Sequence, residues 1–216
     1  MKNPAIIKPR RPTDETLRAS RTQQILDAAA RLFARHGYAD ADTQLLADEL
    51  GVGKGTIYRY FPSKKDLFLA AADRVMRQLR DQIDLCIADV ADPLDRIAVA
   101  IRTFLAFFAE NPDFVELLMQ ERAQFKDRKE PTYFQHRKVN VERWKTLYRE
   151  LMAQGRIRAM PVERITNVLS DLVYGTMFSN YFTGNQKSFE AQAKDILDVV
   201  FHGILSDAER ACRQPV

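Results

Sequence analysis

The sequence predicts an all-α protein of about nine helices, with a small N-terminal domain and a larger C-terminal domain. Before Asp92, apolar side chains recur at the three- and four-residue spacing of amphipathic helices. Beyond Asp92 no alternation typical of strands occurs, and proline and glycine divide the chain into helical lengths. The 46% hydrophobic and 29% charged residues are ordinary proportions for a soluble globular protein.

Residues 1–12 are predicted to form a flexible basic arm. Its prolines and basic side chains include Pro4, Pro9, Pro12, Lys8, Arg10 and Arg11. Such a segment is expected to be extended, and it could reach a DNA minor groove beside a DNA-binding domain. The alternative is a disordered tail that only aids solubility. The arm has no apolar core of signal-peptide length, so we expect a cytoplasmic protein.

The first full helix is predicted from Ser20 to His36, or from as early as Thr13. Ser20 and Gln23 have the spacing of a capping box, and Gly37 is a typical helix stop. The helix carries an apolar stripe of Ile25, Leu26, Ala29, Leu32 and Phe33. We expect this helix to brace the two shorter helices that follow.

A short helix and a turn are predicted after Thr43, which is a good N-cap residue. Leu46, Ala47 and Leu50 form one inner face of this helix. Gly51 then suits the positive φ that often follows a helix C-terminus. The sequence therefore predicts a sharp turn into a second short helix.

The second short helix is predicted from Lys54 to Phe61, with Ile57 and Phe61 pointing inward. Its outward residues are Lys54, Gly55, Thr56, Tyr58, Arg59 and Tyr60. Basic and hydroxyl side chains of this kind donate hydrogen bonds to base edges and phosphates. The two helices and their turn match a helix-turn-helix, although a polar outer face on any small helix pair is the alternative.

The excess positive charge lies with these helices. In residues 1–65 twelve basic side chains stand against seven acidic ones, a net charge of +5; because the whole chain carries +4, residues 66–216 carry −1. A polyanionic partner such as DNA requires this distribution. Charge alone would equally fit a solvated basic face.

The segment GVGKGTIYRYFPSKKDLF resembles the recognition segment of the TetR/AcrR family of bacterial transcription regulators. The upstream segment RTQQILDAAARLFARHGYADADTQLLADEL resembles the first helix of that family and the start of its second. The resemblance implies a DNA-binding domain over residues 13–62 and a ligand-sensing and dimerisation domain over residues 63–216. It also implies a double-stranded DNA operator as partner. Repression is the usual mode of the family, with activation as the alternative.

The resemblance also implies roles for individual residues. The expected phosphate contacts are Thr43, Thr56, Tyr60 and Lys64. The expected residues at or near base edges are Gln44, Lys54, Gly55, Tyr58 and Arg59. The chain departs from the family at Gly53, where serine is common, so we expect a weaker cap on the recognition helix.

A long connecting helix is predicted over residues 63–90. Ser63 can cap it, with Asp66 in capping-box spacing. One side of it carries Leu67, Ala71, Val75, Leu79, Ile83 and Ile87. Its length predicts a strut between the two domains.

The remaining helices are predicted at about 93–109, 112–126, 132–154, 161–183 and 187–212. Asp92 and Asn111 each precede a proline and are expected to cap the helices that follow. Gly155 and Gly184 are the expected stops.

The last two predicted helices are apolar on most of their surface, so each should be buried on more than one side. Packing against a second copy of the chain is the simplest cover, and an ordinary monomer core is the alternative. The resemblance implies a homodimer through a four-helix bundle built from these two helices.

Large apolar side chains are numerous in the middle helices, where a helical bundle can enclose a ligand. The candidates are Phe104, Phe107, Phe108, Trp144, Tyr148, Tyr174, Met177, Phe178 and Tyr181. Each could simply be core, but the resemblance implies an inducer pocket here. Arg122, Gln124, His136 and Arg137 could orient polar groups of a small, largely apolar effector.

Nothing in the sequence predicts an enzyme, a cofactor or a metal site. The three histidines lie in no catalytic or metal motif, and GVGKGT lacks the spacing of a phosphate-binding loop. Cys86 and Cys212 are expected to be incidental. A helical scaffold or membrane-surface module with a basic face is the contrasting hypothesis; we expect no membrane partner, because the apolar residues near Tyr58 are used by the inner face.

Overall fold

The computed structural model describes residues 14–184 and 187–204, and these residues form nine α-helices and no strand. In chain order the helices are α1 (Asp14–Asp40), α2 (Thr43–Glu49), α3 (Lys54–Tyr60), α4 (Lys64–Ile87), α5 (Pro93–Glu110), α6 (Pro112–Gln124), α7 (Thr132–Ala153), α8 (Val162–Thr183) and α9 (Phe189–His202). The all-α prediction is confirmed. The basic arm, the predicted end of the last helix and Cys212 lie outside the described residues.

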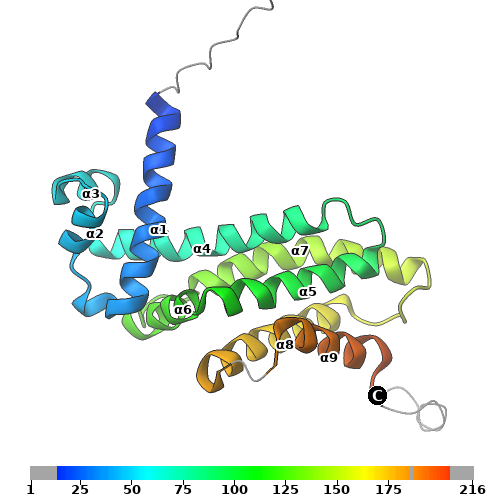
Figure 1. Cartoon of the computed structure of the whole chain (residues 1–216). Coiled ribbons are helices and arrows are strands. Elements are labelled where there is room, and N and C mark those ends of the chain that lie inside the picture. The colour runs from blue at the N-terminus through cyan, green and yellow to red at the C-terminus, as the bar shows by residue number, and fades with distance from the viewer. Residues whose placement is uncertain (1–13, 185–186, 205–216) are drawn as a thin grey trace, which may run out of the picture.

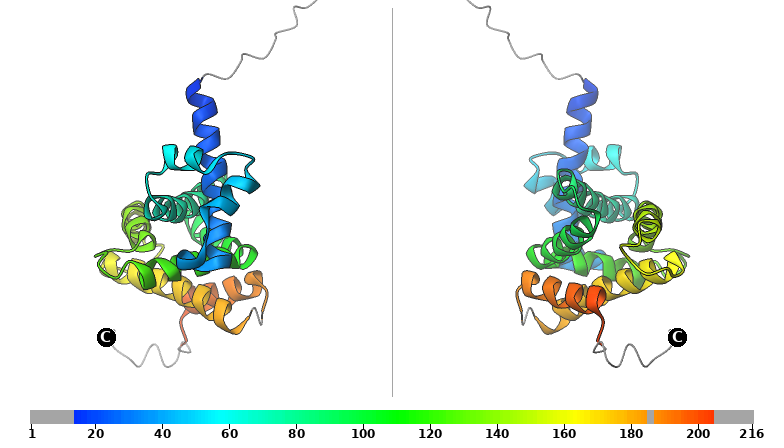
Figure 2. Two further views of the ribbon diagram at one scale, coloured as in Figure 1. Left: turned by 90° about the vertical axis from the view of Figure 1, so that its left-hand side faces the viewer. Right: turned by 90° about the vertical axis from the view of Figure 1, so that its right-hand side faces the viewer.

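The three N-terminal helices stand at one end of the molecule, and α4 runs from them along the larger group of helices (Figure 1). α8 and α9 form a layer on the side away from α2 and α3 (Figure 2). Within the described residues no helix is both long enough and apolar enough to cross a bilayer.

The helix α1 has the longer of its two predicted N-terminal extents. It begins at Asp14 and runs to Asp40, although Gly37, with φ 75° and ψ 162°, breaks its helical path. The start at Asp14 agrees with the earlier predicted start, near Thr13, rather than with Ser20, and Gly37 interrupts the helix where expected. The first seven residues of α1 are exposed and contain no helix breaker, so propensity extends the helix beyond its buried stripe.

An aromatic cluster joins the N-terminal helices to the rest of the fold. The rings of Phe33 and Phe68 lie 5.0 Å apart, and Tyr38 packs edge-on against Phe68 at 5.4 Å. Phe125, just after α6, contacts Tyr38 at 5.0 Å and Phe68 at 5.5 Å. Residues that are distant in sequence thus share one core between the two domains.

The connecting helix α4 follows the prediction closely. The Ser63 hydroxyl accepts a hydrogen bond from the Asp66 amide at 3.0 Å, as a capping box requires. Its apolar side is buried through Leu79, whereas Leu85 near its end is 77% exposed. The strut is therefore held by packing along most of its length.

The two proline-marked helix starts differ. Asp92 caps α5 and accepts a hydrogen bond from the Leu94 amide at 2.8 Å, as predicted. Asn111 makes no side-chain cap for α6; its Nδ2 instead donates to the Phe107 carbonyl at 2.8 Å. The Asn111 prediction was wrong because an asparagine amide can also satisfy an orphan carbonyl at the end of the preceding helix.

A buried carboxylate caps α7 from the neighbouring helix. Pro131 precedes α7 and supplies no side-chain cap. Glu121 of α6 is 1% exposed, and its Oε1 accepts from the amide and the hydroxyl of Thr132 at 2.9 and 3.0 Å. Arg128 lies 3.2 Å from the same oxygen. This tertiary cap has no local sequence signal.

The last two helices leave apolar surface uncovered in the single chain. Gly184, with φ 73°, ends α8 as predicted, and Ser188 caps α9. Leu169 and Ile196 are buried, but Val168 is 59% exposed and Phe182 is 69% exposed. The protomer thus buries one face of this pair and leaves another to solvent.

Candidate functional site

The pair α2 and α3 forms a helix-turn-helix around a tight turn. Gly51 has φ 63°, and the Val52 amide donates to the Ala47 carbonyl at 2.9 Å. Leu46 and Ile57 are fully buried. Their burial sets which side of α3 faces outward.

The outward side of α3 is presented to solvent with little covering it. Gly55 and Arg59 are exposed, and a Cβ added at Gly55 would meet no heavy atom within 4 Å. The Arg59 guanidinium makes only a long contact, 3.5 Å, to the Thr56 hydroxyl. Gly53 is the N-cap and makes no side-chain bond, as expected from the absent serine. A partner could therefore approach the backbone of α3 closely at this point.

An ion pair and a hydrogen bond hold two of the predicted base-edge residues, Lys54 and Gln44. Lys54 Nζ lies 2.9 Å from Asp42 Oδ1, and this hydrogen bond raises the pKa of Lys54. The Gln44 amide and then Lys54 lower the pKa of Asp42. The Gln44 side chain donates to Asp48 at 2.7 Å. Asp42 is a site residue that sequence reasoning missed, although aspartate before a helix is a strong N-cap signal.

Thr43 differs from its predicted place. Asp42 is the N-cap of α2, so the prediction of Thr43 as the cap was wrong. Thr43 is 2% exposed, and its hydroxyl lies 3.1 Å from the Tyr58 hydroxyl. These two predicted DNA contacts are therefore joined to each other, and Thr43 braces Tyr58 from inside.

The two remaining predicted phosphate contacts flank this surface. Lys64 donates to the Ala39 carbonyl at 2.9 Å and lies over the Tyr38 ring at 5.2 Å. Tyr60 is half-buried, and Arg18 of α1 lies over its ring at 5.9 Å. Arg18, in the first turns of α1, was not among the predicted site residues.

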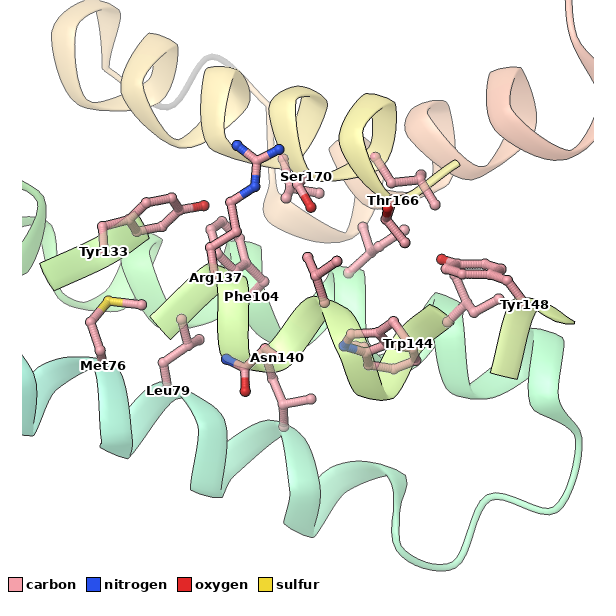
Figure 3. Close-up of a pocket in the computed structure, with 17 residues that line it drawn as sticks. Met76, Leu79, Phe104, Tyr133, Arg137, Asn140, Trp144, Tyr148, Thr166 and Ser170 are labelled. Atoms are coloured by element: carbon pink, nitrogen blue, oxygen red, sulfur yellow. The ribbon is translucent and has the colours of Figure 1, made fainter. Parts of the chain in front are cut away.

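A cavity of about 150 Å³ lies between the middle helices α4, α5, α7 and α8 and is partly open to solvent (Figure 3). Its wall is mostly apolar. The lining residues are Met76, Leu79, Ile83, Ile97, Ala100, Ile101, Phe104, Tyr133, Arg137, Asn140, Val141, Trp144, Tyr148, Thr166, Leu169, Ser170 and Val173. The lining residues from α7 recur at helical spacing on one face of that helix, and this spacing is visible in the sequence.

The structure brings together only part of the predicted ligand set. Phe104, Trp144 and Tyr148 line the cavity, with Arg137 among the predicted polar residues. Phe108, Met177 and Tyr181 line a second cavity of about 220 Å³ between α5, α6 and α8. Three predicted residues line neither of these two cavities: Phe107, Tyr174 and Phe178. The first of these rings packs against Phe108 and Phe114, and the other two pack on one another beside Tyr133.

The other polar candidates stand outside the first cavity. His136 Nε2 lies 2.7 Å from Asp73 and thereby ties α7 to α4. Arg122 and Gln124 are exposed. Within the part of the chain that the structure describes, no three side chains of metal-binding type come close enough to hold a metal ion.

Comparison with known proteins finds two family models in this chain. Residues 25–71 match the model of bacterial regulatory proteins of the tetR family, and residues 90–177 match a tetracyclin repressor-like C-terminal domain. An uncharacterized HTH-type transcriptional regulator of Mycobacterium tuberculosis is 39% identical over 100 residues, which are 44% of this chain and 50% of that protein. The chain thus spans half the length of that relative.

Two further proteins resemble the chain over more of its length. The nucleoid occlusion factor SlmA of Vibrio campbellii is 28% identical over 155 residues, 68% of this chain and 75% of that protein. The crystal structure of the transcriptional regulator FadR from Bacillus subtilis, in complex with stearoyl-CoA, has a TM-score of 0.72 at 20% identity and covers 84% of this chain and 98% of that chain. With the helix-turn-helix at α2 and α3 and the helical domain behind it, both family models identify the chain as a member of the TetR family of bacterial regulatory proteins.

Proposed function

We propose that this protein is a transcriptional repressor that binds a roughly palindromic DNA operator as a homodimer and releases it when a small, largely apolar effector binds. The observation that carries the proposal is the open outer face of α3, where Gly55 and Arg59 are exposed on a buried scaffold. The charge of +5 over residues 1–65 supports a polyanionic partner. In this proposal residues 13–62 bind DNA, and residues 63–216 sense the effector and dimerise.

A stripe along α8 supports a homodimer through the last two helices. Val168, Leu172, Gly175, Ser179 and Phe182 recur at helical spacing, and all five are exposed. The small residues in its middle would let a second helix approach closely. Val199 and Phe201 of α9 add apolar surface, at 50% and 43% exposure. Two such faces could bury one another, and a two-fold dimer would set two copies of α3 at a fixed spacing.

The helix α4 offers a physical link between the cavity and α3. On one side its Asp73 binds His136 of α7, beside the cavity residue Arg137. One residue further, Arg74 lies 3.2 Å from Asp27 of α1. We infer that an effector moves α4 relative to α1 and shifts the paired recognition helices away from operator spacing. Such a switch needs an affinity difference between two states of about 1–3 kcal/mol. FadR from Bacillus subtilis, which binds stearoyl-CoA, indicates that this fold can host an apolar ligand.

Replacing Gly55 by alanine should change stability and DNA affinity in opposite directions. Alanine is the better helix former and would meet no neighbour, so the free energy of unfolding should rise by about 0.5 kcal/mol. If DNA lies against this backbone, the added methyl group should lower operator affinity about tenfold, or about 1.4 kcal/mol. Urea denaturation and gel-shift titration on operator selected from random DNA measure the two effects. Unchanged DNA affinity would show that nothing approaches Gly55.

Arg59→Ala tests the proposed function directly. We expect a loss of about 1–3 kcal/mol in operator binding and a relaxed preference at the contacted base pairs. The matched control is Lys138→Ala, which removes an exposed positive charge from α7, far from α3 in the chain. Fluorescence anisotropy with operator and random duplexes at physiological salt gives both affinities. The proposal fails if the wild-type protein prefers no sequence, or if the two variants behave alike.

A further inference from the structure

The hydroxyls of two buried tyrosines point into the first cavity from opposite ends. Tyr133 and Tyr148 are each 6% exposed, and both line the cavity. Figure 3 shows their hydroxyl groups directed toward the middle of the site. Within the described residues, neither hydroxyl has a hydrogen-bond partner in the protein. Neither oxygen is among the buried side-chain atoms that lack a partner, so both hydroxyls are open to water from the cavity, and a ligand that accepts from them replaces that water.

Both hydroxyls are held in the donor form. Burial raises the pKa of Tyr133 and of Tyr148 well above the usual value, so neither ionises near neutral pH. A neutral phenol can donate its O–H to an acceptor on a ligand, and its oxygen can also accept. The Thr166 hydroxyl donates to the Val162 and Glu163 carbonyls of its own helix, and no hydrogen bond joins it to either tyrosine within the described residues.

The cavity wall carries no uncompensated charge. Among the residues that line this cavity, Arg137 is the only one whose side chain is charged at neutral pH. Its Nη1 lies 2.8 Å from Asp171, which neutralises it. An anionic ligand could pair with Arg137 only by displacing the Asp171 carboxylate, which lowers its affinity. If it did not pair with Arg137, it would lose its hydration without gaining a cationic partner, which also lowers its affinity.

The size and length of the site restrict the ligand further. A cavity of about 150 Å³ matches the volume that accepts a benzene-sized molecule. Tyr133 and Tyr148 are 15 positions apart on one helix, which separates their Cα atoms by about 22 Å along α7. Because the cavity is partly open to solvent, a ring with a short substituent at each end can extend between the two tyrosines.

We propose that this cavity binds an uncharged, ring-bearing molecule with a carbonyl or ether oxygen at each end, and that Tyr133 and Tyr148 donate to those oxygens. The assignment rests on the proposed function, because it names the chemical class of the effector. It excludes carboxylates and long charged thioesters as the preferred ligands of this cavity.

Three probes of one shape test the assignment on the full-length protein. 1,4-Diacetylbenzene has an acceptor at each end, 1,4-diethylbenzene has none, and terephthalate has a carboxylate at each end. Trp144 is the only tryptophan of the chain and lines the cavity, so its fluorescence reports binding, with calorimetry as a second measurement. We expect diacetylbenzene to bind about tenfold more tightly than diethylbenzene, and terephthalate to bind most weakly.

The variant Tyr148→Phe removes one donor and keeps the ring. It should weaken diacetylbenzene binding about five- to tenfold and leave diethylbenzene binding unchanged. Its unliganded thermal midpoint should not fall, because only an unpaired hydroxyl is lost. Thr146→Val, which removes an exposed hydroxyl from the same helix, is the matched control and should change neither affinity.

The proposal is overturned if terephthalate binds as tightly as diacetylbenzene, if Tyr148→Phe binds diacetylbenzene as tightly as wild type, or if none of the three probes binds at millimolar concentration. Gel-shift titrations on the same preparations keep the two proposals apart. Sequence-specific DNA binding without probe binding removes only the ligand class, whereas its absence removes the proposed function.

Discussion

We expect Val168→Asp to prevent the proposed homodimer from forming, so that the variant is monomeric and loses tight operator binding. Val168 is 59% exposed in the protomer and lies in the apolar stripe of α8. Placing a charge on an apolar residue that becomes buried in an interface costs about 2 kcal/mol or more. Because two-fold symmetry places the change in both subunits, the dimer should weaken by about 4 kcal/mol, or roughly a thousandfold.

Sedimentation velocity over a concentration series measures this change, and gel shift measures its effect on DNA. Since Val168 is already in contact with solvent, the protomer should keep its helical circular dichroism spectrum. Asn167→Asp places the same charge one position away, outside the stripe, and should leave the dimer nearly intact. A Val168→Asp protein that stays dimeric at wild-type affinity would move the interface elsewhere.

The second large effect concerns the buried carboxylate of Glu121. Glu121→Ala should lower the free energy of unfolding by about 3–5 kcal/mol, because it leaves Arg128 without its partner and Thr132 without its acceptor. That loss is a large fraction of the about 5–15 kcal/mol that stabilises a typical domain. Urea denaturation followed by circular dichroism measures it.

Three variants identify the cause of the loss. Glu150→Ala removes an exposed glutamate from α7 and should change stability by no more than about 0.5 kcal/mol. Glu121→Gln keeps an acceptor for Thr132 but loses the charge, so its free energy of unfolding should lie between those of the wild type and Glu121→Ala. Adding Arg128→Ala to Glu121→Ala should cost little more, since the arginine has already lost its partner. Simple additivity of the two substitutions would contradict the ion pair as the cause.

Much of the fold could be predicted because its signals are local. Ser63, Asp92 and Gly184 act on residues within one helical turn, so their effects are readable from the chain itself. The capping predictions that failed were made from local signals that are compatible with two different structures. Asn111 could cap the next helix or close the previous one, and both Asp42 and Thr43 were acceptable caps.

The candidate site was only partly predictable. The outer face of α3 follows from the burial of Ile57, and a helix of seven residues leaves little freedom in which side chains face outward. The cavity lining depends on four helices, and predicting aromatic residues as a class included Phe107 and Tyr174, which line neither described cavity. It also omitted Tyr133, Asn140 and Thr166, because a polar residue in a helix carries no mark of facing a cavity.

The sequence by itself determined the helices, the glycine turn between α2 and α3, and the basic half of the chain, since capping, backbone freedom and charge are properties of neighbouring residues. Only the tertiary structure decided that Glu121 caps α7, that Phe125 packs against Tyr38, and that two tyrosine hydroxyls share one cavity. Those contacts depend on the angles and registers at which helices pack. These packing angles and registers depend on the shapes of side chains from distant parts of the chain, acting together.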